Sequence, residues 1–305
     1  MSQALEDIRK QIDTLDDKIH DLLMQRASLI IDISREKKKA NIQTVQPARE
    51  AAMIRRLLDR HAGALPEAAI VRIWRELVGA VSLLQTGLKV AVTAPDAQNP
   101  YWDMAKDYFG SVLPMIRLPS ALAAIGAVRG GETSFAVLPW PQDGEKNPWW
   151  GYLVSQEPSE RMRIVCALPY GSAEENFTNL IDKALVVSKT DFSASGMDHS
   201  FLALELDGNV SRARIVDGLK AFDLEPLSVH TRQDVPPAGR GLHIVEVDDY
   251  IGENDERLKK IEKKFEESAG RCVSLGGYPV PPVFDARKHQ KVQQDADEDT
   301  AAAGG

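Results

Sequence analysis

The chain has 305 residues, of which 43% are hydrophobic and 27% charged, a composition typical of a globular protein with several packed cores. It has no run near the roughly 20 apolar residues of a membrane span, and no apolar N-terminal run of signal-peptide type. Its net charge is −8, which argues against nucleic acid as the main partner, because duplex binders need a concentrated basic face.

The first 88 residues differ in charge from the rest of the chain. They hold 14 Lys and Arg against 12 Asp and Glu, a balance of +2, so the remainder carries −10. The two cysteines lie far apart and lack metal-ligand spacing, so we expect a reducing, cytoplasmic location and no metal site.

Residues 5–88 have the pattern of helices only. A first helix is expected over about 5–40, and its apolar residues alternate at spacings of three and four, a heptad seam that requires a partner helix from this chain or another subunit. Pro47 suits the first turn of a second helix, and Pro66 begins a third. The seam consists of Leu5, Ile8, Ile12, Leu15, Ile19, Leu22, Leu29 and Ile33.

Arg26 stands where this seam requires an apolar residue. An uncompensated buried guanidinium costs several kcal/mol, so the side chain either reaches solvent, pairs with a carboxylate of a facing helix, or binds an anionic ligand in a cavity among the helices. Lys37 follows eleven residues later, which places it on the same face about 16 Å along the axis. With Arg49 and Glu50 opening the second helix and Gln85 on the third, the pattern favours a pocket for a compact, multiply charged anion.

The segments "LEDIRKQIDTLDDKIHDLLMQR", "VQPAREAAMIRRL" and "IVRIWRELVGAVSLLQ" resemble the all-helical chorismate mutases over nearly all of residues 5–88. The resemblance implies an intertwined homodimer of three-helix chains. It also implies conversion of chorismate to prephenate, a Claisen rearrangement in aromatic amino-acid biosynthesis (the shikimate pathway) that needs no cofactor.

The resemblance assigns a role to each site residue. Arg26 and Arg49 are expected to bind the two carboxylates of chorismate, with Arg9 reaching over from the partner subunit. Lys37 and Gln85 are expected to donate hydrogen bonds to the ether oxygen, and Glu50 to accept one from the ring hydroxyl. Two positions depart from the family's pattern: Gln46 stands where the family often has Asp, and Val81 where it commonly has Ser.

The remaining chain divides into three further regions. Residues 89–195 alternate strands with helices, which predicts an α/β domain, and residues 196–284 read as β-α-β-β-α-β, a ferredoxin-like α+β unit. Residues 285–305 are polar and aperiodic and are expected to be disordered. With an all-α domain over residues 1–88, we therefore predict a multidomain chain.

A mutase followed by these two units resembles the bifunctional chorismate mutase–prephenate dehydratases. The stretches "LPSALAAIGAVRGGETSFAVLPWPQD" and "RCVSLGGYPVPP" resemble parts of the dehydratase and of its amino-acid-binding ACT domain. The family's Pro-Ile-Glu-Asn-Ser motif falls on residues 139–143 without its Glu, and its Thr-Arg-Phe motif on residues 183–185 without its Arg. The ACT motif Glu-Ser-Arg-Pro keeps only Arg232, and we expect His230 and Arg232 at an exposed strand end.

Three functions are compatible with this sequence. The favoured one is a chorismate mutase whose C-terminal region is a degenerate, regulatory or non-catalytic relative of the dehydratase. The second is a working bifunctional mutase–dehydratase, and the third is a non-catalytic dimeric sensor of chorismate or an amino acid. An aromatic amino acid is a possible effector in each case.

Overall fold

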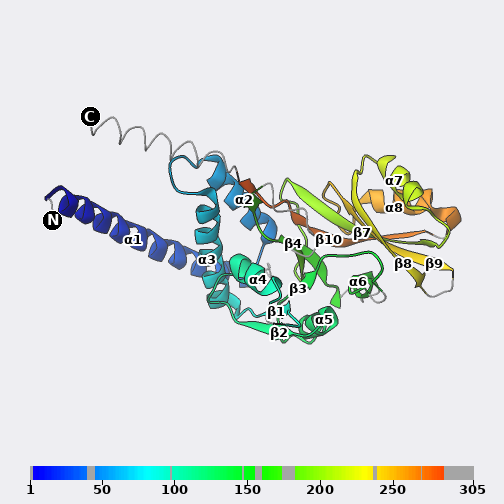
Figure 1. The fold of residues 1–305 in the computed structure, drawn as a ribbon, viewed down its shortest axis with the longest axis horizontal. Helices are drawn as coiled ribbons and strands as arrows, with labels where there is room; N and C mark the ends of the chain where they lie inside the picture. The colour runs from blue at the N-terminus through cyan, green and yellow to red at the C-terminus, as the bar shows by residue number, and fades with distance from the viewer. Residues whose placement is uncertain are drawn as a thin grey trace.

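Three helices lead into a large mixed β-sheet that carries helices on its faces (Figure 1). The computed structural model describes residues 3–39, 45–96, 98–145, 148–154, 160–173, 183–235, 239–268 and 270–284. The predicted disordered tail lies outside these residues. None of the described helices is long and apolar enough to cross a membrane.

The three predicted N-terminal helices are confirmed. Helix α1 has 37 residues and is therefore about 55 Å long, and Pro47 occupies the first turn of α2 as expected. Gly87, which directly follows the third helix, has a φ of +61° and ends the helical block. The helices are α1 (Gln3–Lys39), α2 (Pro47–Asp59) and α3 (Glu67–Thr86).

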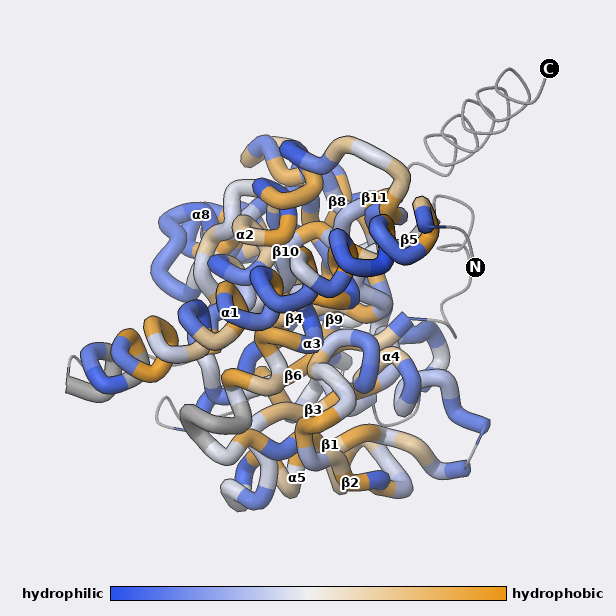
Figure 2. Tube along the Cα trace, turned by 90° about the vertical axis from the view of Figure 1, so that its left-hand side faces the viewer, coloured by the Kyte–Doolittle hydropathy of each residue, from blue (hydrophilic) through white to orange (hydrophobic). Residues whose placement is uncertain are grey.

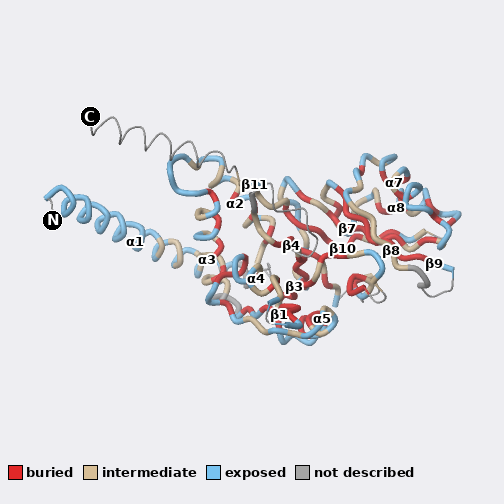
Figure 3. Tube along the Cα trace, viewed as in Figure 1, coloured by how far each residue is buried: buried red, intermediate tan, exposed pale blue. Residues whose placement is uncertain are grey.

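Helix α1 projects from the body of the molecule (Figures 1 and 3). All eight seam residues are at least 40% exposed, from Leu5 at 40% to Leu29 at 64%. Figure 2 shows apolar and polar stretches alternating along this helix. A row of exposed leucines and isoleucines of this length marks an interaction surface, because water-exposed apolar patches of this size are rare on monomeric proteins.

Helix α3 packs tightly on helix α4 (Tyr101–Phe109) of the α/β region. Gly79 permits the contact: a Cβ atom there would lie 1.9 Å from the carbonyl oxygen of Phe109. Beside it, the Glu76 carboxylate accepts hydrogen bonds from the Ser111 amide and hydroxyl, at 2.8 and 2.6 Å. The helical region and the α/β region therefore share a close-packed interface.

The α/β region confirms the predicted alternation and adds four elements: α4, β2, α6 and β5. Strands β1, β2 and β3 are parallel to one another. Strand β6 pairs antiparallel with β3, and β4 pairs antiparallel with β6. Helices α4 and α5 bury opposite faces of it, in two separate apolar cores. The elements are β1 (Val90–Thr93), β2 (Met115–Leu118), α5 (Ala121–Arg129), β3 (Phe135–Pro139), α6 (Gly151–Val154), β4 (Arg163–Leu168), β5 (Ser172–Ala173) and β6 (Ala184–Ser188).

The predicted β-α-β-β-α-β unit is also confirmed. Its strands lie in the order β10-β7-β9-β8, and its two helices cover one face of the sheet. Strand β10 runs parallel to β4 through the pair Gly276 and Ile164, so both regions belong to one nine-stranded sheet. The elements are β7 (Asp198–Asp207), α7 (Arg212–Lys220), β8 (Pro226–Val235), β9 (Arg240–Val247), α8 (Glu256–Lys264), the 3-10 turn Glu266–Ser268, β10 (Arg271–Pro279) and β11 (Val283–Phe284).

His243 on β9 makes the stability of this sheet sensitive to pH. The residue is 2% exposed, and burial lowers the pKa of its imidazole to about 4. Its folded pKa lies below the unfolded value near 6.5, so the free energy of unfolding is expected to fall by about 2–3 kcal/mol as pH drops from 6.5 to 4. Denaturant titrations of wild type and His243→Gln across that range test this: the variant loses most of the slope, and His20→Gln, on the exposed α1, keeps it. An unchanged slope in His243→Gln would contradict the assignment.

Candidate functional site

Arg26 lies on the face of α1 that turns toward its own chain. Leu23, Arg26, Ala27 and Ile30 are half-buried, whereas their seam neighbours are exposed. Burial lowers the pKa of the Arg26 guanidinium. Within the described part of the chain it has no recorded ion pair or hydrogen bond. Of the three readings of this arginine, pairing with a carboxylate of a facing helix in the same chain therefore receives no support.

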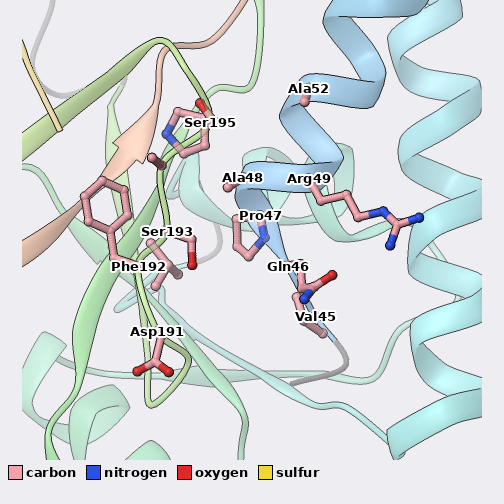
Figure 4. Close-up of a pocket in the computed structure, with 13 residues that line it drawn as sticks. Val45, Gln46, Pro47, Ala48, Arg49, Ala52, Asp191, Phe192, Ser193 and Ser195 are labelled. Atoms are coloured by element: carbon pink, nitrogen blue, oxygen red, sulfur yellow. The ribbon is translucent and has the colours of Figure 1, made fainter. Parts of the chain in front are cut away.

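The first turn of α2 carries three of the predicted site residues. Gln46 is the N-cap and makes no side-chain capping bond to α2, while Arg49 is exposed and has no recorded ion pair in the described residues. Arg49 extends to the side of α2 opposite Ser193 and Ser195 (Figure 4). Gln46 and Arg49 are among the residues that line a cleft of about 480 Å³ between α2 and the segment 191–195, but the guanidinium of Arg49 points away from that segment.

Glu50 is fixed by a buried arginine that the sequence did not single out. Its Oε2 lies 2.8 Å from Nη1 of Arg75, and the two side chains are only 15% and 4% exposed. Nε of Arg75 donates to the carbonyl oxygen of Tyr108 at 2.7 Å. Burial lowers the pKa of Arg75, but its interactions with Tyr108 and Glu50 outweigh burial and raise that pKa above its ordinary value. The guanidinium therefore stays charged.

The third helix completes this side of the predicted pocket. Val81 is half-buried and offers no polar group, which matches the departure noted in the sequence. Ser82, the next residue, lines a small cavity together with Glu50 and Arg75. Its volume of about 20 Å³ is enough for one water molecule but not for chorismate.

Arg9 is exposed near the start of α1, as the resemblance requires for a residue that acts on a partner's site. It precedes Arg26 by 17 residues, or roughly 26 Å along the helix. The two arginines of one chain are therefore too far apart to contact a single small dianion. The side chains of Lys37 and Gln85 lie outside the described residues, although both belong to helices.

The structure thus brings only some of the predicted residues together. Gln46 and Arg49 line one cleft, whereas Glu50 lines a separate cavity with Ser82, which the site prediction did not include. No recorded contact joins Arg26 to Arg49 or Glu50 within the described part of the chain. Arg75 escaped prediction because an arginine on an apolar helix face has no sequence motif, and only its burial reveals it.

A second cavity, of about 460 Å³, lies between the α/β region and the ferredoxin-like unit. Trp140, Lys183, Tyr278 and Glu246 are among the residues that line it. Burial raises the pKa of Glu246, but bonds from His199, Tyr278 and Ser228 outweigh burial and hold that pKa below its usual range. The sequence did not predict this carboxylate.

His230 also lines this second cavity, and the expectation for it was wrong. Its side chain is 12% exposed and lies 3.6 Å from Asp143, so it does not stand at an exposed strand end. Burial lowers the pKa of its imidazole. Strand β8 places it against the α/β region, a contact that the sequence of the strand alone does not reveal. Across the described residues, no group of three or more His, Cys, Asp and Glu side chains is placed to hold a metal ion.

Comparison with known protein families identifies the helical region. Residues 8–86 match the family Chorismate mutase type II. The N-terminal region is a type II chorismate mutase domain. The matched residues, 8–86, include every predicted mutase residue.

The mutase domain has relatives among bifunctional enzymes. The chain is 34% identical over 112 residues to the bifunctional chorismate mutase/prephenate dehydratase of Aquifex aeolicus, covering 35% of this chain and 31% of the relative. It is 27% identical over 146 residues to the enzyme of the same description from Pseudomonas aeruginosa, covering 44% and 38%. The chain thus matches only about a third of the length of these relatives.

Part of the chain is also similar to solved structures, at low TM-scores. The prephenate dehydratase from Streptococcus mutans is similar at a TM-score of 0.46 and 15% identity, covering 64% of this chain and all of that one. The prephenate dehydratase from Arthrobacter aurescens in complex with L-Phe is similar at a TM-score of 0.44 and 12% identity, covering 71% of this chain and 99% of that one.

Proposed function

We propose that this protein is a chorismate mutase that converts chorismate to prephenate in aromatic amino-acid biosynthesis. The observation that carries the proposal is Arg26: its guanidinium is half-buried, has no recorded partner among the described residues, and lies on α1 of a chorismate mutase domain. Because burying an unpaired charge is costly, an anionic ligand supplies the compensation that the chain does not.

The chemistry needs positioning more than it needs a reactive group. Chorismate rearranges only when its enol-ether side chain folds over the ring, which brings its two carboxylates into a compact shape. Arg26 and Arg49 can each hold a carboxylate through two parallel charge-assisted hydrogen bonds. Holding the reactive conformer in this way removes an entropic part of the barrier.

Charge stabilisation supplies the second contribution. Negative charge grows on the ether oxygen as its bond to carbon breaks, and donors fixed at that oxygen bind the transition state better than the substrate. Lys37 and Gln85 take this role in the proposal, and Glu50 accepts a hydrogen bond from the ring hydroxyl. Loss of one such donor typically lowers the rate 10²–10³-fold.

The site is proposed to form only in a homodimer. The exposed seam of α1 needs an apolar partner, and a second copy of α1 offers the same heptad pattern. Each buried leucine or isoleucine contributes about 1.5–3 kcal/mol. The 26 Å between Arg9 and Arg26 supports the same arrangement, because Arg9 can then serve the partner's site.

The α/β region and the ferredoxin-like unit are proposed to be non-catalytic or regulatory, the latter as an ACT-like domain. Residues 139–143 lack the dehydratase glutamate, and Lys183 begins the segment that lacks the dehydratase arginine. The α/β region therefore lacks both the acid and the carboxylate-binding arginine that would catalyse loss of water and carbon dioxide from prephenate.

One assay separates the three candidate functions. Purified protein supplied with chorismate at neutral pH is expected to form prephenate. Phenylpyruvate should then appear no faster than it does in a prephenate solution without protein. Prephenate and phenylpyruvate are followed by proton NMR in the same sample. Enzymatic phenylpyruvate would show a working dehydratase, and failure to consume chorismate would leave only the sensor.

A further inference from the structure

Arg75 joins the mutase domain to the α/β region through one planar group. It is 3% exposed. One edge of the guanidinium meets Glu50 of α2 at 2.8 Å, and Nε meets the backbone oxygen of Tyr108 of α4 at 2.7 Å. Because the donors of a guanidinium have a rigid geometry, this arrangement fixes where Glu50 lies relative to α4.

Aromatic rings hold the guanidinium from the α/β side. Its central carbon lies 3.7 Å from the ring centroid of Tyr108 and 5.5 Å from that of Tyr170. Such cation–π contacts strengthen when water is excluded, as it is here. Arg75 therefore cannot swing away from Glu50 without leaving both rings.

Arg75 is the cation that faces Glu50 in this cluster. The other titratable groups around the pair are Tyr108 from α4, Cys166 from β4 and Tyr170 beyond β4. Burial raises the pKa of all three, to about 12 for Cys166. These groups are neutral at physiological pH, so the charge of Glu50 is balanced by Arg75.

Glu50 keeps one oxygen for a ligand. Arg75 engages Oε2, whereas Oε1 has no hydrogen bond recorded in the described part of the chain. We propose that Arg75 is a positioning residue of the mutase site: from α3 it holds Glu50 so that Oε1 accepts a hydrogen bond from the substrate's ring hydroxyl, and the α/β region in turn holds Arg75 through Tyr108 and Tyr170. This inference rests on the proposed mutase function. It makes the α/β region a structural part of the mutase pocket.

A double-mutant cycle in the full-length protein tests this role. We expect Arg75→Met to lower kcat/KM for chorismate about 10²-fold at neutral pH, the usual effect of misplacing a group that orients substrate. In the Glu50→Gln background, Arg75→Met adds less than about twofold, within the error of additivity.

Matched variants separate positioning from folding. Arg72→Met removes an arginine from the same helix that pairs with Asp107 at the same interface but is 71% exposed, and it should leave kcat/KM unchanged. Arg75→Lys keeps the positive charge but not the planar set of donors of the guanidinium. It should lower kcat/KM less than Arg75→Met does, and this loss should also vanish in the Glu50→Gln background. If Arg75→Met does not fold, Arg75→Lys provides the cycle.

The outcomes distinguish this inference from the mutase proposal. An inactive wild type overturns both. An active wild type with full activity in Arg75→Met and Arg75→Lys overturns the positioning role alone. The same holds if either substitution causes its full loss in the Glu50→Gln background, because that additivity indicates a structural role independent of Glu50.

Discussion

Arg26→Ala is expected to lower kcat/KM for chorismate roughly 30- to 5,000-fold while the protein stays folded. This corresponds to a rise of about 2–5 kcal/mol in the activation free energy. The loss arises because a substrate carboxylate is left without its charge-assisted bonds inside the pocket. Folding should survive because Arg26 has no recorded partner in the described residues, so its removal leaves no buried group unsatisfied. Initial rates of chorismate consumption and circular dichroism measure the two effects.

Arg35→Ala is the matched control on the same helix. Arg35 pairs with Asp32 at 3.0 Å on the exposed surface, and such pairs contribute about 0–1 kcal/mol. It should keep the wild-type rate, whereas Lys37→Ala should lose turnover as Arg26→Ala does. Prephenate formation at the wild-type rate by Arg26→Ala would remove Arg26 from the site.

Leu15→Asp combined with Leu22→Asp is expected to abolish the dimer and, with it, mutase activity. The two leucines are 56% and 63% exposed in the single chain, and burial of both in two symmetric copies contributes roughly 6–12 kcal/mol. Aspartates at these positions also place like charges in the seam. Sedimentation equilibrium should show a dimer for the wild type and a monomer for the double variant.

Lys10→Asp provides the control for charge on α1. Lys10 lies about 120–140° around the helix from both leucines, so its aspartate faces away from the seam. This variant should remain dimeric and active. A double variant that stays dimeric at micromolar concentration would show that the α1 seam is not the dimer interface.

The fold was predictable where the sequence repeats or alternates. The heptad spacing of α1 and the order of elements in the ferredoxin-like unit follow from local pattern alone. Helix α4 was missed because Pro100 at its N-cap makes no side-chain bond, and the helix is stabilised by packing of Tyr101, Ala105, Tyr108 and Phe109 against the sheet. Strand β2 was missed because four residues carry too little periodicity to identify.

The candidate site was predictable only to the extent that a family motif marks it. The residues Arg26, Arg49 and Glu50 follow from such motifs, and so do their expected roles. The sequence did not predict which side of α3 is most buried; that side carries Arg75 and Gly79. That choice depends on the surface of α4, which is distant in sequence, so local pattern cannot reveal it.

Mixing two inactive variants tests most directly whether the mutase site is shared between subunits. Arg9→Ala and Arg26→Ala each damage both sites of their own homodimer. After unfolding and refolding together in equal amounts, half of the dimers are heterodimers, and each of these has one intact site of two. The account predicts recovery of about a quarter of wild-type activity. Activity no higher than the average of the two variants would contradict it.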